Sequence, residues 1–226
     1  MSLRSIVGPR TTPALLAVHM SEQVTVLFPM AGRGERFGGT FKPFLTFGDQ
    51  TFIEAALAPF RPYARQIREF VFAYLGEQEE AHAVKKRLET MFSGLPMRTV
   101  TFATPTRGPA ETISRAVRSL DVKGPVVICD CDHAVQVGPL FARFEAAAPW
   151  TAVVPLWNLA GEDVKSWAVA GLASDGRLRA IAEKAKPAGY EQVAGVIGCY
   201  AFADIEATLA LGDAISATNF RTSFRR

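Results

Sequence analysis

Apolar runs alternate with one-sided amphipathic stretches along most of this sequence. Continuous runs rich in β-branched and aromatic residues predict buried strands, whereas apolar residues spaced three or four positions apart predict helices. The predicted strands cover residues 24–30, 68–75, 97–102, 125–129, 151–157, 167–173 and 196–202. The predicted helices cover residues 52–60 and 77–92, and a third opens at Gly108-Pro109, where proline suits the first turn. This alternation predicts an α/β fold built on βαβ units.

A glycine-rich loop follows the first predicted strand. It reads Ala31-Gly32-Arg33-Gly34-Glu35-Arg36, and a second glycine pair leads to Lys42-Pro43. Glycine lets the backbone adopt positive φ and approach a ligand closely, and successive free N–H groups in such a loop form an anion site. Three cations accompany the loop, namely Arg33, Arg36 and Lys42. The loop therefore predicts a site for a phosphate chain.

Two common phosphate loops do not fit this stretch. A dinucleotide fingerprint needs a third glycine where Phe37 stands and a helix that opens at once, whereas Lys42-Pro43 would stop a helix. The chain contains no G-x-x-x-x-G-K-[ST] pattern, which excludes a Walker-type loop. The remaining alternative is a glycine turn with scattered surface cations.

Two aspartates follow the apolar strand that ends at Cys129. Because open α/β sheets bind ligands beyond the carboxyl ends of their strands, we expect the glycine loop and this acidic pair to meet at one edge. On an extended segment Asp130 and Asp132 point to the same side, and two carboxylates suit a hard divalent ion such as Mg²⁺. The alternative is that either aspartate caps a turn or the next helix. His133 is interpreted either as a residue that orients the substrate or, as is more common for a loop histidine, as a bystander.

Composition narrows the class of protein. The chain has 226 residues, of which 49% are hydrophobic and 21% charged, typical of an ordinary globular domain. A net charge of +3 is too mild to predict nucleic-acid binding, and the apolar patch at residues 14–18 is too short to span a membrane. Three cysteines do not make a secreted scaffold, so we expect a cytoplasmic protein. Residues 1–19 are interpreted as a disordered, vector-derived or upstream extension before a single domain at 20–226.

The strand, the G-x-G-x-R loop and the K-P that follows resemble the N-terminal signature of nucleotidylyltransferases, the sugar-1-phosphate nucleotidylyltransferase or NDP-sugar pyrophosphorylase family. The resemblance covers about residues 22–205. It implies a three-layer α/β/α Rossmann-like nucleotide-diphospho-sugar transferase fold with a mixed, mainly parallel sheet. It also implies a Mg²⁺-dependent enzyme, of a kind used in polysaccharide biosynthesis, that transfers a nucleotidyl group from an NTP to a sugar 1-phosphate or similar phosphorylated acceptor and releases pyrophosphate.

The resemblance assigns roles to individual residues. The implied catalytic residues are Arg36, Lys42 and Asp132, with Asp132 as the metal ligand and Asp130 in support. The implied nucleotide-binding residues are Ala31, Gly32, Arg33, Gly34 and Gly108. The implied sugar-phosphate-binding residues are Glu183, Lys184 and Gly198. The base, the acceptor and any homo-oligomer are left open.

The sequence differs from the family pattern in one respect, and two alternative functions remain open. Members of the family commonly supply a second metal-binding aspartate beyond the glycine-tyrosine strand. Here the nearby candidates are Asp204 and Asp213, and neither matches the family motif. The domain is therefore interpreted as C-terminally shortened. The first rival is a GT-A type glycosyltransferase, because Asp130-x-Asp132 is also a metal motif of that class. The second is a non-catalytic nucleotide- or sugar-binding module.

Overall fold

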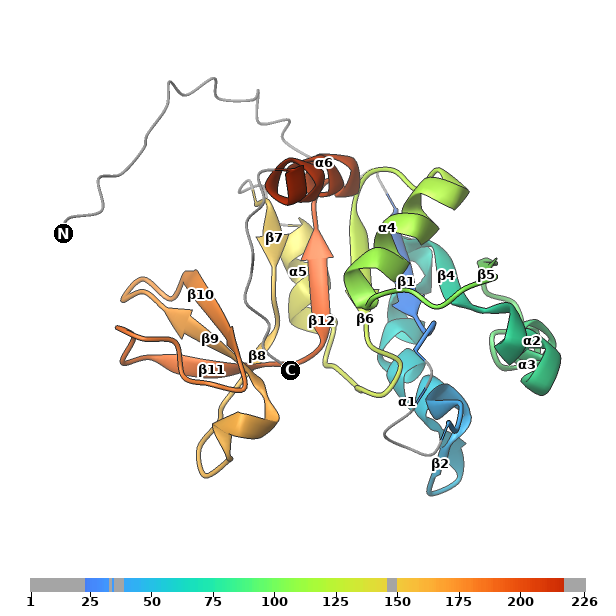
Figure 1. The fold of residues 1–226 in the computed structure, drawn as a ribbon, viewed down its shortest axis with the longest axis horizontal. Coiled ribbons are helices and arrows are strands. Elements are labelled where there is room, and N and C mark those ends of the chain that lie inside the picture. Colours follow the sequence, from blue (N-terminus) through green and yellow to red (C-terminus); the bar gives the residue numbers. More distant parts are fainter. Residues whose placement is uncertain (1–22, 33, 35–38, 146–149, 218–226) are drawn as a thin grey trace.

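The computed structural model describes residues 23–32, 34, 39–145 and 150–217. Its centre is a six-stranded sheet of order β5-β4-β1-β6-β12-β7 (Figure 1). The strands of this sheet are β1 (Val24–Pro29), β4 (Ile67–Leu75), β5 (Met97–Phe102), β6 (Val126–Cys129), β7 (Ala152–Val153) and β12 (Cys199–Phe202). The neighbours β5, β4, β1 and β6 run parallel, and β12 is antiparallel to β6 and β7. The mixed, mainly parallel sheet that the family resemblance implies is confirmed.

Helices cover both faces of this sheet. The α-helices are α1 (Phe52–Leu57), α2 (Gly76–His82), α3 (Val84–Met91), α4 (Pro109–Leu120), α5 (Gly138–Glu145) and α6 (Ile205–Ala217), and the 3-10 helices are η2 (Lys42–Phe44), η3 (Ala58–Gln66) and η4 (Val164–Ser166). Successive side chains of strand β1 point to opposite faces of the sheet. Val26 and Phe28 pack with residues of α1, α3 and α5, whereas Leu27 packs with residues of α4 and α6. Three layers result, as expected.

A smaller antiparallel sheet of order β10-β9-β11-β8 stands beside the β7 and β12 end of the central sheet (Figure 1). Its strands are β8 (Leu156–Trp157), β9 (Ala168–Leu172), β10 (Leu178–Glu183) and β11 (Val193–Val196), and a separate hairpin joins β2 (Thr46–Phe47) to β3 (Gln50–Thr51). None of the helices in the described part of the chain is long and apolar enough to cross a membrane.

Two predicted strands are each divided between the two sheets. The segment predicted as one strand at 151–157 forms β7 in the central sheet and β8 in the smaller one. The segment at 196–202 divides in the same way, with β11 ending at Val196 and β12 starting at Cys199. Gly198 lies at this second crossing with a φ of +52°, a conformation that breaks a strand. An apolar run does not reveal which sheet it joins, so this part of the prediction is wrong.

Two predicted helices also differ from the structure. The helix expected at 77–92 is two helices, α2 and α3, because Ala83 between them is left-handed with a φ of 47°. The Glu79 carboxylate accepts the backbone N–H of Lys85 at 2.9 Å, which satisfies a donor at the start of α3. The helix expected at 52–60 ends as an α-helix at Leu57 and continues as η3, which contains Pro62.

Candidate active site

The end of β1 and the start of the glycine loop form one wall of the site. Gly34 has a φ of +64°, and a Cβ at this position would overlap the carbonyl oxygen of Thr40. The N–H of Gly39 donates to the carbonyl of Gly34 at 3.1 Å and draws the two glycine-containing ends of the loop together. This position therefore requires glycine. The predicted site residues Arg33 and Arg36 lie outside the described residues.

A cavity of about 620 Å³ opens at the carboxyl end of β1. It is lined by residues 29–32 and 34 of the first strand and loop, by Lys42-Pro43, by 105–109 with Thr112, and by Cys131. Three of the predicted nucleotide-binding residues, Ala31, Gly32 and Gly34, thus share this cavity with the predicted Gly108 and Lys42. A cavity of this size and position suits a small-molecule ligand.

Lys42 and Asp132 form an ion pair at the edge of the cavity. Lys42 is the first residue of η2, and Asp132 lies in the turn after β6, 90 residues later in the chain. Their side chains are 33% and 20% exposed, respectively, so each charge is partly removed from water and has a partner of opposite sign. The contact brings together two residues to which the sequence assigned catalytic roles.

Asp130 and Asp132 converge on the Nδ1 atom of His133. The distances are 3.6 Å from Asp130 Oδ2 and 3.5 Å from Asp132 Oδ1, which fits ion pairs but is too long for hydrogen bonds. The Asp130 carboxylate, with help from Asp132, raises the pKa of His133 above its ordinary value, against the opposing effects of burial and Lys42. Of the two interpretations of His133 from the sequence, this placement beside both carboxylates favours a role at the site.

These three side chains can hold a metal ion. One ligand atom from each of Asp130, Asp132 and His133 lies within 4.8 Å of the others. The carboxylates meet for a different reason from the one expected, because the chain turns at Cys131 and Asp132 instead of continuing as an extended segment. Two carboxylate oxygens are suitable donors for Mg²⁺, and an imidazole nitrogen adds a donor that many divalent metals accept.

Gly198 supports this cluster from the crossing between the two sheets. Its carbonyl accepts the backbone N–H of Asp130 at 2.8 Å. A Cβ at Gly198 would lie 2.9 Å from His133 Nδ1 and closer still to Asp130 Oδ2. With its φ of +52°, the position favours glycine for both backbone and space. The structure thus places Gly198, a predicted sugar-phosphate residue, directly against the acidic cluster.

The cysteines near the cluster are buried or packed against the core. Cys129 and Cys199 are buried in the core, and Cys131 is packed against it. Burial, followed by the nearby Asp132 and Asp130 carboxylates, raises the pKa of Cys131 to about 12. The thiol therefore stays protonated near neutral pH and is a poor nucleophile. Cys129 and Cys199 thus pack in the core as small apolar residues.

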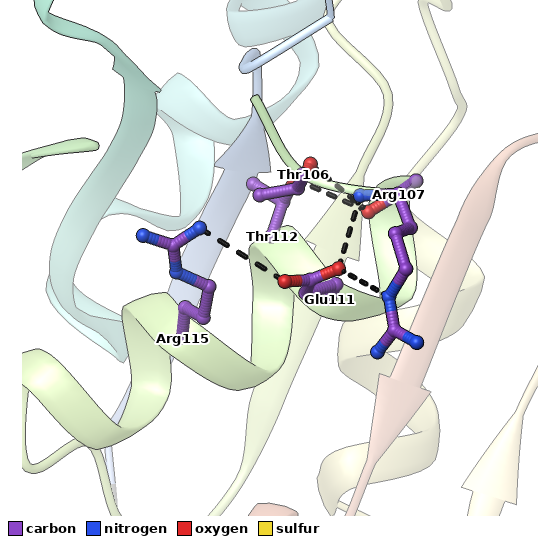
Figure 2. Close-up of polar contacts among 6 residues, drawn as sticks. Thr106, Arg107, Glu111, Thr112 and Arg115 are labelled. Atoms are coloured by element: carbon purple, nitrogen blue, oxygen red, sulfur yellow. Dashed lines mark hydrogen bonds and ion pairs between the residues drawn. The ribbon is translucent and has the colours of Figure 1, made fainter. Parts of the chain in front are cut away.

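The opposite wall of the cavity is the turn that begins α4, shown in Figure 2. Gly108 is the N-cap residue, and its carbonyl accepts the backbone N–H of Thr112 at 3.1 Å. The hydroxyls of Thr106 and Thr112 lie 2.7 Å apart, and Glu111 accepts from both the backbone N–H and Nε of Arg107 (Figure 2). These bonds fix the turn. The backbone of Gly108 is extended, and no atom lies within 4 Å of where its Cβ would be.

Glu183 and Lys184 lie at the end of β10 in the smaller sheet, exposed and outside the lining of the cavity. Lys184 is left-handed with a φ of 55°, and its N–H donates to the carbonyl of Trp167 at 2.9 Å. Tyr200 lies on β12. Burial raises the pKa of Tyr200, and the carboxylates of Asp130 and Glu183 raise it further.

Gln78 contributes to the site without any signal in the sequence. Its side chain on α2 is buried and donates to the carbonyl of Gly32 at 2.8 Å. A glutamine in an amphipathic helix is an ordinary surface residue by its pattern, so only the tertiary packing of α2 against β4 reveals the contact. His133 had one signal that was available, its position directly after Asp132.

Comparisons with solved structures give the same architecture. The nucleoside-diphosphate-sugar pyrophosphorylase from Vibrio cholerae RC9 superposes with a TM-score of 0.69 at 20% identity, covering 88% of this chain and 82% of that one. A putative glucose-1-phosphate thymidylyltransferase from Bacillus anthracis gives 0.67 at 17% identity, covering 84% and 75%. The inositol-1-phosphate CTP transferase from T. maritima gives 0.66 at 14% identity, covering 86% and 75%.

Sequence comparison identifies the family. Among curated proteins, none matches the chain significantly. The model of the MobA-like NTP transferase domain, in contrast, matches residues 26–198. This range contains the glycine loop, the Lys42–Asp132 pair and the turn that begins α4. Because the match covers well over half of the chain, the protein is a nucleotidyltransferase that belongs to the MobA-like NTP transferase domain family.

Proposed function

We propose that this nucleotidyltransferase transfers the nucleotidyl group of an NTP to a sugar 1-phosphate or a similar phosphorylated acceptor and releases pyrophosphate. The observation that carries the proposal is the Lys42–Asp132 ion pair at the cavity, because it joins a cation suited to phosphate and a carboxylate suited to a metal. Similar solved proteins include a putative glucose-1-phosphate thymidylyltransferase and an inositol-1-phosphate CTP transferase, and their names support this class of acceptor.

The cavity between the glycine loop and the α4 turn is assigned to the NTP. The triphosphate would lie against Gly32 and Gly34, where no side chain blocks the backbone. Arg33 and Arg36, which belong to the same loop in the sequence, are proposed as cations for its charge. The base would lie toward Gly108, where the space next to the Cα is open. The bonds within the α4 turn would hold these backbone groups in place before the nucleotide arrives, which lowers the entropy cost of binding.

The acidic cluster is assigned to a divalent metal, Mg²⁺ in our proposal. Asp132 and Asp130 would supply carboxylate oxygens, and His133 faces the same point. Such a metal, when bound, neutralises charge on phosphate oxygens and orients them. Gly198 would keep room for the ligand atoms of Asp130 and His133, because any side chain there would displace them.

Lys42 would act on the NTP, and Lys184 would act on the phosphorylated acceptor. Phosphoryl-type transfers depend mainly on positioning and charge neutralisation, so little covalent work falls to the protein. The Lys42 ammonium would exchange part of its contact with Asp132 for phosphate oxygens of the NTP and stabilise charge there as pyrophosphate leaves. Lys184, with Glu183, would receive the phosphorylated acceptor from the smaller sheet. The free cysteines suit a reduced compartment, so we place the reaction in the cytoplasm. From the resemblance to sugar-1-phosphate nucleotidylyltransferases, we propose that its product supplies polysaccharide synthesis.

The proposal is tested by pyrophosphate release. A thermal-shift screen of the four NTPs and several sugar 1-phosphates with Mg²⁺ selects the pairs to assay. We expect at least one pair to give pyrophosphate, and the Asp132→Asn variant to give none. Sugar transfer from an NDP-sugar without pyrophosphate would indicate a glycosyltransferase, and binding without turnover would indicate a non-catalytic module. Either result would contradict the proposal.

A further inference from the structure

The buried side chain of Gln78 connects the end of β4 to the start of the glycine loop. It is 7% exposed, and its Oε1 accepts the backbone N–H of Leu75 at 2.8 Å. Its Nε2 donates to the carbonyl of Gly32 at 2.8 Å. The orientation of the amide follows from chemistry, because the Leu75 N–H can only donate and the Gly32 carbonyl can only accept. A neutral side chain with both a donor and an acceptor is required at this position.

The other end of the loop contacts α2, the helix that carries Gln78, and the next helix, α3. The ring of Phe41 stacks on His82 at the end of α2, with ring centroids 5.3 Å apart and an interplanar angle of 13°. The guanidinium of Arg87 on α3 lies 3.6 Å from the centre of the Phe44 ring. Phe41 and Phe44 are on either side of Lys42-Pro43. The helices α2 and α3 therefore hold both the start and the end of the loop whose residues line the cavity.

We propose that Gln78 is a positioning residue for the phosphate chain of the NTP, acting through the carbonyl of Gly32; this rests on the proposed function. Because Gln78 donates to the C=O of Gly32, this carbonyl is directed toward α2. A free carbonyl could instead rotate toward the anionic phosphates and repel them. Gln78 thus keeps this acceptor directed away from the triphosphate.

The proposal is tested with Gln78→Met, which removes both hydrogen bonds at similar size, and Gln78→Glu, which at pH 8 keeps an acceptor but loses the donor. Gln66→Met is the matched control, because Gln66 also donates from its amide nitrogen, to Glu145 at 3.3 Å. Its partner Glu145 does not line the cavity, whereas Gly32, the partner of Gln78, does. Calorimetry measures binding of inorganic tripolyphosphate and of the four NTPs with Mg²⁺. Steady-state kinetics then gives KM for the NTP and for the acceptor, and urea unfolding gives stability.

We expect both Gln78 variants to bind tripolyphosphate and NTP at least tenfold more weakly, with KM for the acceptor changed less than twofold and the control unchanged. Equal affinities for the wild type and the folded Gln78 variants would overturn the inference. A similar weakening toward NTP and acceptor, in step with lost stability, would show a merely structural residue and overturn it too. If the wild type itself bound neither tripolyphosphate nor any NTP, the proposed function would fail first.

Discussion

Replacing Gly198 by alanine should damage the acidic cluster more than the fold. The new methyl group would lie 2.9 Å from His133 Nδ1 and closer to Asp130 Oδ2, so both side chains must move. The left-handed conformation of the residue adds a cost of about 1–2 kcal/mol for any residue with a Cβ. Gly176 offers a matched control, because it has a φ of +76° and no atom within 4 Å of its Cβ position.

The two variants separate backbone strain from damage to the site. Urea unfolding should show that Gly176→Ala and Gly198→Ala each lose at least about 1–2 kcal/mol of stability. Only Gly198→Ala should also lose turnover, by about 10²-fold, because a misplacement of about 1 Å in a catalytic arrangement has an effect of this order. Pyrophosphate release measures the turnover, and calorimetry measures Mg²⁺ affinity with the NTP bound. Wild-type kcat/KM and metal affinity in folded Gly198→Ala would refute the reasoning.

Three further predictions concern the charged residues. Lys42→Met should lower kcat by about 10²–10³, equivalent to about 2.7–4 kcal/mol, because a charge-stabilising contact is lost; a near-normal rate of pyrophosphate release would contradict its role. Asp132→Asn should abolish metal-dependent activity and Asp130→Asn should reduce it less, as a Mg²⁺ titration of both variants would show; the reverse order would exchange their roles. Lys184→Ala should raise KM for the acceptor more than KM for the NTP, and unchanged acceptor kinetics at saturating NTP would leave Lys184 as a surface residue.

The parallel strands β1, β4 and β6 of the central sheet were predictable because they are largely continuous apolar runs, as strands covered on both faces require. Strand β6 is short and fully apolar, and strand β4 is buried over most of its length, as expected for strands covered on both faces. The carboxyl ends of β1 and β6 then meet at one edge, as the rule for open sheets predicts, and the Lys42–Asp132 pair forms there. This much follows from local pattern and sheet topology.

The rest depends on geometry that no local pattern contains. The division of 151–157 and 196–202 between two sheets follows from chain crossings, one of which uses the positive φ of Gly198. The approach of His133 to Asp130 requires that crossing, because Gly198 leaves the space that both side chains occupy. Gln78 appears in the sequence as one polar residue of a helix, and its role depends on how α2 packs against β4.

The most direct test of the central claim follows two labels of one NTP. The wild-type protein is incubated with Mg²⁺, a sugar 1-phosphate selected by thermal shift, and the preferred NTP labelled on either the α- or the γ-phosphate. We predict that the α-label appears in an NDP-sugar and the γ-label in pyrophosphate, in equal amounts. Release of the γ-label as inorganic phosphate, or no transfer of the α-label to any acceptor that binds, would contradict nucleotidyl transfer.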